Sequence, residues 1–207
     1  MGTLYICELI IQIFRMMSSQ INVLEAILKS PRSVFNTQSI RMLTGVEGNR
    51  LSKSLNYYVK TGEILNPRKG IYAKTGYNPE ELACSLFRPS YISLEYVLQR
   101  AGVIFQYDEA ITCVSYLCRE VSVDGRDYSF RIINPQIWIG LEGIERRDNV
   151  CLASAERAFI DLVYLSAGNC YFDNLRPLNK KKIKELLPLY NSKILSERIA
   201  GILNMKL

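Results

Sequence analysis

Apolar residues in the first third of the chain recur at the spacing of short helices. Four of them share one helical face and predict a first helix of about ten residues: Ile21, Leu24, Ile27 and Leu28. Ser30, Pro31 and Ser33 follow directly and end this helix.

A second helix is predicted to begin after Asn36, whose side chain suits the N-cap position. Phe35 and Ile40 are spaced to pack on each other across that cap, as in a hydrophobic staple. Gly45 and Gly48 then bracket a tight turn.

The third predicted helix, from about Asn49 to Lys60, has one apolar and one polar face. The apolar face holds Leu51, Leu55, Tyr58 and Val59. The opposite face holds residue types that contact phosphates and base edges: Arg50, Lys53, Asn56, Tyr57 and Lys60. We expect base contacts from the start of the helix (Asn49, Arg50 and Lys53), whereas Lys60 is either a phosphate contact or a solvated lysine.

After Gly62 the pattern changes to that of a short β-hairpin. Ile64 and Leu65 predict one strand, and Ile71 and Tyr72 predict the returning strand. The residues between them, numbers 66–70, include Pro67 and Gly70 and therefore predict a turn.

The order helix, helix, turn, helix and hairpin is that of a winged helix-turn-helix. In the helix-turn-helix class the second helix of the motif lies in the DNA major groove. Arg68 and Lys69, at the predicted hairpin tip, are expected to meet the DNA backbone or the minor groove. Some winged helices bind protein rather than DNA, and this alternative stays open.

The pattern beyond residue 78 predicts an α+β domain. Residues 90–102 predict an N-capped helix, and residues 111–123 and 128–139 predict two strands joined at Asp124-Gly125, a hairpin signal. Trp138 stands at the end of the second of these strands.

The remaining elements follow closely along the chain. Residues 150–152 predict a third strand, and Ser154 can cap a helix from Ala155 to about Leu165. One or two amphipathic helices are predicted in the tail, around residues 183–187 and 194–202. The whole chain is thus expected to be α+β: a winged helix-turn-helix over residues 19–77, then a C-terminal domain over residues 78–207 with an antiparallel hairpin or small sheet flanked by helices.

Positive charge gathers in the predicted winged helix. The chain has a net charge of +6, and residues 19–77 alone carry nine Lys/Arg against three Glu. Phosphate contacts require such an excess. A solvated basic face is the alternative that charge alone leaves open.

The absence of histidine excludes several kinds of chemistry. Ser-His-Asp and Cys-His catalysis cannot be built, and neither can zinc sites of mixed Cys/His type. The six cysteines contain no CxxC pair and predict buried free thiols in a reducing cytoplasm. No metal or other cofactor is expected, and no nucleophile stands beside a recognisable base, so we expect the chain not to be an enzyme.

The first seventeen residues, MGTLYICELIIQIFRMM, form a separate segment. Glu8 and Arg15 interrupt the apolar run, which is too short to span a bilayer, and a secretory signal is not indicated. The segment, residues 1–18 in our division, is either a short helix that docks on the body or on a partner, or an extension that results from an incorrect start site.

Two segments of the C-terminal domain resemble a known family. YISLEYVLQRAG (residues 91–102) and ASAERAFIDLVYL (residues 153–165), behind a winged helix and a central hairpin, resemble the AbiEi antitoxins of type IV, abortive-infection toxin–antitoxin systems. Many relatives read Ser-Pro-Glu-Lys-Ala in the second segment, so Ala155 and Arg157 depart from the family pattern.

This resemblance implies a cytoplasmic, phage-defence protein with two tasks. The winged helix would repress its own operon by binding inverted repeats in the promoter, as a monomer in solution or pairing on the DNA. The second domain would counteract a nucleotidyltransferase toxin; a stable complex with the toxin is not required, and no membrane is involved. The candidates for DNA binding, taken from the pattern of the winged helix, are Gln38, Arg41, Asn49, Arg50, Lys53, Asn56, Tyr57, Lys60, Arg68 and Lys69, and the candidates for antitoxin activity are Glu156, Arg157 and Asp161.

Two alternatives remain from the sequence. Glu156, Arg157 and Asp161 are equally explained as residues that cap and pair on a helix. The C-terminal domain is also compatible with a sensor of a small ligand, which predicts an enclosed apolar pocket with a few polar groups.

Overall fold

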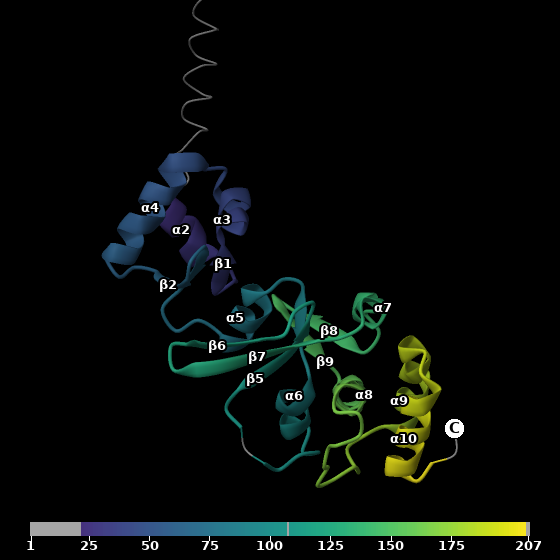
Figure 1. The fold of residues 1–207 in the computed structure, drawn as a ribbon. Coiled ribbons are helices and arrows are strands. Elements are labelled where there is room, and N and C mark those ends of the chain that lie inside the picture. Colours follow the sequence, from purple (N-terminus) through teal and green to yellow (C-terminus); the bar gives the residue numbers. More distant parts are fainter. Residues whose placement is uncertain (1–21, 107, 206–207) are drawn as a thin grey trace, which may run out of the picture. The chain divides into compact units, whose positions relative to one another are not determined.

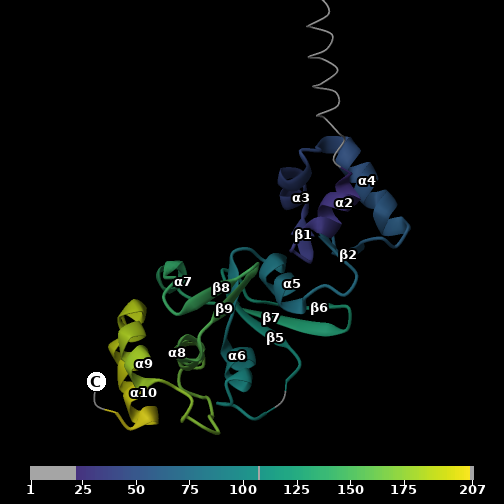
Figure 2. The ribbon, with the colours of Figure 1, turned by 180° about the vertical axis from the view of Figure 1, so that it is seen from behind.

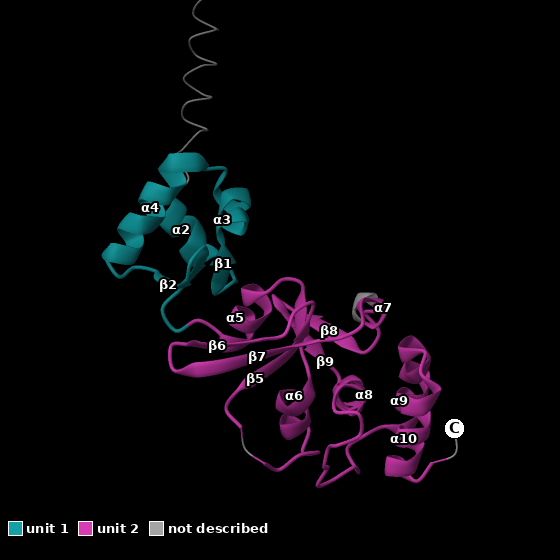
Figure 3. Ribbon diagram, in the orientation of Figure 1, with its two compact units in different colours: residues 1–76 teal, residues 77–207 magenta. Residues whose placement is uncertain are grey.

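The computed structural model describes residues 22–106 and 108–205, except for the side chains of Trp138 and Ile139. The chain divides into two compact units, residues 1–76 (unit 1) and residues 77–207 (unit 2) (Figure 3). The boundary expected from the sequence lies one residue later. The predicted N-terminal segment, residues 1–18, lies outside the described residues.

In its described part, residues 22–76, unit 1 combines three helices with a small sheet. Its elements are α2 (Val23–Lys29), β1 (Val34–Asn36), α3 (Thr37–Thr44), α4 (Gly48–Lys60), β2 (Leu65–Arg68) and β3 (Ile71–Ala73) (Figure 1). The strands form an antiparallel three-stranded sheet in the order β1-β3-β2. The predicted helices and hairpin are confirmed, although the first helix has seven residues rather than about ten and β2 extends to Arg68, into the turn predicted at residues 66–70. Strand β1 was not predicted, because three residues are too few to show an alternating pattern.

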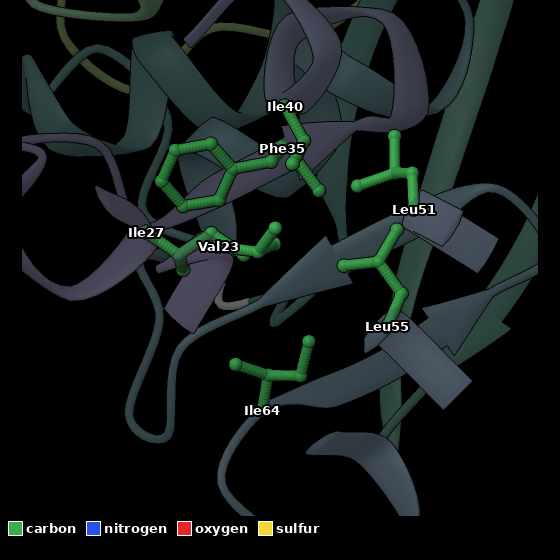
Figure 4. Packing of buried hydrophobic residues seen from close by; sticks show 7 residues of the cluster. All are labelled: Val23, Ile27, Phe35, Ile40, Leu51, Leu55 and Ile64. Atoms are coloured by element: carbon green, nitrogen blue, oxygen red, sulfur yellow. The ribbon is translucent and has the colours of Figure 1, made fainter. Parts of the chain in front are cut away.

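One apolar cluster holds these elements together (Figure 4). Its buried members come from all three helices, from β1 and from the residue before β2: Val23, Ile27, Phe35, Ile40, Leu51, Leu55 and Ile64. The predicted cap of α3 is confirmed. The Asn36 side-chain oxygen accepts a hydrogen bond from the backbone amide of Ser39 at 2.7 Å. In return, the Ser39 hydroxyl accepts one from the backbone amide of Asn36 at 3.0 Å.

Unit 2 is built on a six-stranded mixed sheet. Its strand order is β6-β7-β5-β4-β9-β8, with α5 on one side of the sheet and α6 and α8 on the other (Figures 1 and 2). The strands are β4 (Ser90–Ile92), β5 (Ile111–Ser115), β6 (Arg119–Val123), β7 (Arg126–Ile132), β8 (Ile144–Arg147) and β9 (Val150–Ala153). The helices are α5 (Pro79–Leu86), α6 (Leu94–Arg100), α7 (Pro135–Ile139), α8 (Ala155–Leu165), α9 (Lys180–Leu186), η1 (Leu187–Tyr190) and α10 (Lys193–Leu203).

Several predictions for unit 2 are confirmed. Strands β6 and β7 pair as an antiparallel hairpin around Asp124-Gly125. Strand β9 covers the predicted third strand, and the Ser154 side chain caps α8 as expected. The tail holds the expected helices, α9 and α10.

Three predictions for unit 2 were wrong in detail. Residues 90–102 begin with β4 before α6 starts, and residues 111–123 form two strands rather than one. Residues 128–139 do not form one strand, because β7 ends at Ile132 and α7 follows. Asn134 caps α7 and Pro135 occupies its first turn, a combination that favours a helix start over a continuing strand.

Within the described ranges no helix is long and apolar enough to cross a membrane.

Candidate nucleic-acid interface

Helix α4 presents one face to the core of unit 1 and the other to solvent. Leu51 and Leu55 are at most 1% exposed and pack in the apolar cluster. All six polar candidates on this helix are exposed: Asn49, Arg50, Lys53, Asn56, Tyr57 and Lys60. The spacing of three and four residues between Arg50, Lys53 and Tyr57 keeps them on one stripe of the helix. This stripe offers two cations and an aromatic ring to a ligand, and Asn49 and Asn56 add exposed amides beside it.

Tyr57 is the large aromatic side chain on this stripe. Its side chain is 60% exposed, and its ring stands edge-on to that of Tyr58 with 5.5 Å between centroids. Tyr58 itself is half-buried and donates a hydrogen bond from its hydroxyl to Asn22 at 3.1 Å. Tyr58 therefore anchors α4 to the start of α2, whereas Tyr57 is available for contact.

The remaining candidates of unit 1 lie on α3 and on the β2–β3 hairpin. Gln38 and Arg41 are exposed on α3, and Arg41 makes a long ion pair with Glu47 at 3.9 Å. Lys69 is exposed in the turn between β2 and β3, as predicted for the tip. Arg68, in contrast, is half-buried at the end of β2. The prediction that Arg68 lies at the exposed tip of the hairpin was therefore wrong.

Not every basic residue of unit 1 is available to a ligand. The Lys74 ammonium donates hydrogen bonds to the carbonyl oxygens of Leu28 and Ser30 at 3.0 and 2.5 Å, which satisfies the end of α2. Lys29 pairs with Glu25 on the same helix at 2.5 Å. Among residues 22–76, the other exposed basic side chains lie on α3, α4 and the hairpin turn, except for Arg32 before β1.

The three antitoxin candidates lie inside unit 2. Arg157 and Asp161 are fully buried and form an ion pair at 3.3 Å between Nε and Oδ1, and Glu156 is 6% exposed. The Glu156 carboxylate accepts a hydrogen bond from the backbone amide of Asn179 at 3.2 Å. Their burial favours the interpretation that these residues hold the domain together.

Arg157 joins distant segments of unit 2 through its guanidinium. Beyond Asp161 it donates to the carbonyl oxygens of Ile137 and Glu142, both at 3.0 Å, and to the Tyr91 hydroxyl at 3.3 Å. These segments lie far apart in the sequence, so their contact with Arg157 was not predictable from periodicity.

Asp161 is the acceptor at the centre of this network. It receives hydrogen bonds from the hydroxyls of Tyr91, Ser93 and Tyr190 at 3.0, 2.8 and 2.5 Å. Burial raises the pKa of Asp161 above its usual range, and the neighbouring Arg157 opposes that shift. Sequence reasoning missed Tyr91, Ser93 and Tyr190, although the first two lie in the segment that carries the family resemblance.

Unit 2 also has two adjoining hollows. Their volumes are about 540 and 550 Å³, and both are lined by Glu95 and Arg131, which pair at 3.1 Å. The first lies over strands β5, β6 and β7 and is lined largely by acids and hydroxyls: Asp108, Thr112, Glu120, Ser122, Asp127 and Ser129. The polar lining of the first hollow differs from the enclosed apolar pocket with a few polar groups that a small-ligand sensor predicts, whereas the second hollow has a mixed lining that includes Ile104, Leu162 and Asp173. Within the described ranges no group of three or more Cys, Asp or Glu side chains is placed to hold a metal ion.

No model of a known protein family matches this chain, and comparison with curated proteins gave no match either. The resemblance to AbiEi antitoxins therefore rests on the two segments of unit 2 and on the order of elements.

Proposed function

We propose that this protein is a DNA-binding repressor that acts as the antitoxin of a type IV toxin–antitoxin system. The observation that carries the DNA-binding part is the exposed stripe of α4, which stands within a helix–strand–helix–helix–strand–strand unit. That order and the β1-β3-β2 sheet support the winged helix-turn-helix predicted from the sequence. Residue types that contact bases and phosphates occupy the helix that this class places in the major groove.

The division of contacts within unit 1 follows from the chemistry of the exposed groups. Asn49, Arg50 and Lys53 contact base edges from the start of α4, because amide and guanidinium groups match the edges of adenine and guanine. Gln38, Arg41, Asn56, Tyr57 and Lys60 contact the backbone or neighbouring bases from α3 and α4. Lys69, with Arg68 beside it, contacts the backbone or minor groove from the hairpin.

The DNA target is proposed to be the promoter of the protein's own operon, with inverted repeats bound by one copy each. Footprinting of the protein on the DNA upstream of its gene tests this target. We expect protection of two related half-sites that falls steeply as salt rises, because phosphate contacts release counterions. Protection at no position, or equal affinity for unrelated DNA, contradicts an operator in this promoter.

The antitoxin part of the proposal is supported by the resemblance of residues 91–102 and 153–165 to AbiEi. The proposed opponent is a nucleotidyltransferase toxin encoded next to this gene, and no stable complex with it is required. Burial of Arg157 and Asp161 supports an indirect role for them, in which they maintain the domain that carries the activity.

A growth assay tests the antitoxin activity. The adjacent downstream gene is expressed alone, with the full chain, and with a chain starting at Asn78. We expect the downstream gene to be toxic when expressed alone, and both chains to restore growth. Absence of toxicity or of rescue rules out this activity and favours the alternative of a regulator that senses a small ligand.

A further inference from the structure

Strand β2 of the hairpin is irregular immediately before the turn. Leu65 pairs with Ala73 and Arg68 pairs with Ile71, so that Asn66 and Pro67 together face the single residue Tyr72. This is a β-bulge, a feature that bends a strand and redirects the side chains beyond it. Pro67 has no amide hydrogen, so it cannot donate a backbone hydrogen bond to β3.

The Asn66 side chain supplies two hydrogen bonds at this irregular position. Its amide nitrogen donates to the carbonyl oxygens of Arg68 at 2.9 Å and Ile71 at 2.7 Å. Both partners are carbonyl oxygens, which accept hydrogen bonds. Within the Asn66 side chain only the NH₂ group can donate to them, and the side-chain oxygen cannot. One side chain thus ties the two strands together across the base of the turn.

The other side of the turn is fixed to α3. The Gly70 carbonyl accepts hydrogen bonds from the backbone amide of Thr37 at 3.1 Å and from the Thr37 hydroxyl at 3.3 Å. Gly70 has a φ of 79°, a left-handed conformation that favours glycine. Lys69 lies between these two attachments and is exposed.

We propose that Asn66 is a positioning residue for DNA binding, which holds the hairpin turn so that Lys69 meets the phosphate backbone beside the site read by α4. The proposal rests on the proposed DNA-binding function. Asn66 does not itself contact DNA. Its contribution is to keep the turn in the bound geometry before the DNA arrives, which lowers the ordering cost of binding.

The test measures the affinity of the full chain for two lengths of the same operator duplex. The long duplex carries flanking base pairs on both sides, and the short duplex is trimmed until Lys69→Ala no longer weakens binding. The variants are Asn66→Ala, Lys69→Ala and the double variant. Asn78→Ala is the control. It is also an Asn-to-Ala change that removes hydrogen bonding by an asparagine side chain, but at the N-cap of α5 in unit 2.

We expect Asn66→Ala and Lys69→Ala each to weaken binding to the long duplex about fivefold, the scale of a lost phosphate contact. The double variant binds as well as either single variant, because both changes remove the same contact. On the short duplex Asn66→Ala binds like the wild type. A merely structural role lowers the amount of folded protein and weakens binding to both duplexes equally, so the two roles are distinguished.

Two results overturn the proposal: equal losses on both duplexes, or a double variant that is weaker than either single variant. If the wild type binds neither duplex, the proposed DNA-binding function fails instead. Thermal unfolding of each variant accompanies the titrations and reports any loss of folded protein separately.

Discussion

At the residue scale, two buried polar side chains connect several segments of unit 2. Arg157 and Asp161 are four residues apart on α8 and fully buried, and together they contact hydroxyl or carbonyl groups from β4, α7, η1 and two connecting residues. A buried ion pair is costly to break because the remaining charge stays out of water without a partner.

Asp161→Ala is therefore expected to destabilise unit 2 by about 3–5 kcal/mol, the cost of leaving Arg157 buried and unpaired. The measurement is urea unfolding of the variant against the wild type. Lys193→Ala is the matched control, because it breaks an exposed ion pair of the same spacing, Lys193–Glu197. We expect that change to cost less than about 0.5 kcal/mol. Equal small losses from both changes contradict the role assigned to the buried pair.

The cysteines differ in reactivity according to their burial. Burial raises the pKa of the Cys84 thiol to about 12, and Cys113 is likewise buried with a raised pKa. Cys118 is exposed. Since the thiolate is the reactive form, an alkylating reagent at pH 8 is expected to label Cys118 before Cys84 and Cys113, which react only after unfolding. Peptide mapping after timed labelling measures this order, and early labelling of Cys84 contradicts it.

At the element scale, the sequence predicted those helices and turns that have local signals. Asn36 and Ser154 were identified as caps because capping is a contact between near neighbours in the chain. Asp124-Gly125 was identified as a hairpin turn for the same reason. The failures are short strands such as β4, whose three buried residues continue directly into α6 and read as one apolar segment.

The capping box at Asn36 gives a prediction for α3. Asn36→Ala removes the acceptor of the Ser39 amide and is expected to destabilise unit 1 by about 1 kcal/mol. Denaturant unfolding followed through a probe in unit 1 measures the loss. The exposed Asn49 serves as the control, because Asn49→Ala should leave stability nearly unchanged while it weakens operator binding. The interpretation of the cap is wrong if Asn36→Ala is no less stable than Asn49→Ala.

The candidate site was predictable to the extent that it lies on one helix. Helical periodicity placed Arg50, Lys53 and Tyr57 on the solvent face of α4, and the structure agrees. The hairpin was less predictable, because the bulge and the hydrogen bonds of Asn66 depend on the geometry of two strands. Long-range contacts, such as that of Tyr190 with Asp161, produce no periodic pattern in the sequence and so could not be predicted from it.

At the scale of the whole molecule, each unit has its own sheet and its own core, which allows the two proposed activities to be separated. A chain starting at Asn78 is expected to rescue growth from the proposed toxin and to leave the promoter unrepressed. A reporter fused to the promoter, measured in the same cells as growth, gives both readouts. Repression by this shortened chain contradicts the assignment of operator recognition to unit 1.

The central claim is that α4 recognises the operator, and a fluorescence anisotropy titration at one fixed salt concentration tests it most directly. The titration compares the wild type with Arg50→Ala/Lys53→Ala and with Arg146→Ala/Arg147→Ala, which removes the same charge from exposed positions on β8 of unit 2. We predict that the α4 variant binds about a hundredfold more weakly or worse, because two base-contacting cations are lost. The β8 variant should bind within about threefold of the wild type, because its change affects only the overall charge. Wild-type affinity in the α4 variant, or equal losses in the two variants, would contradict this account.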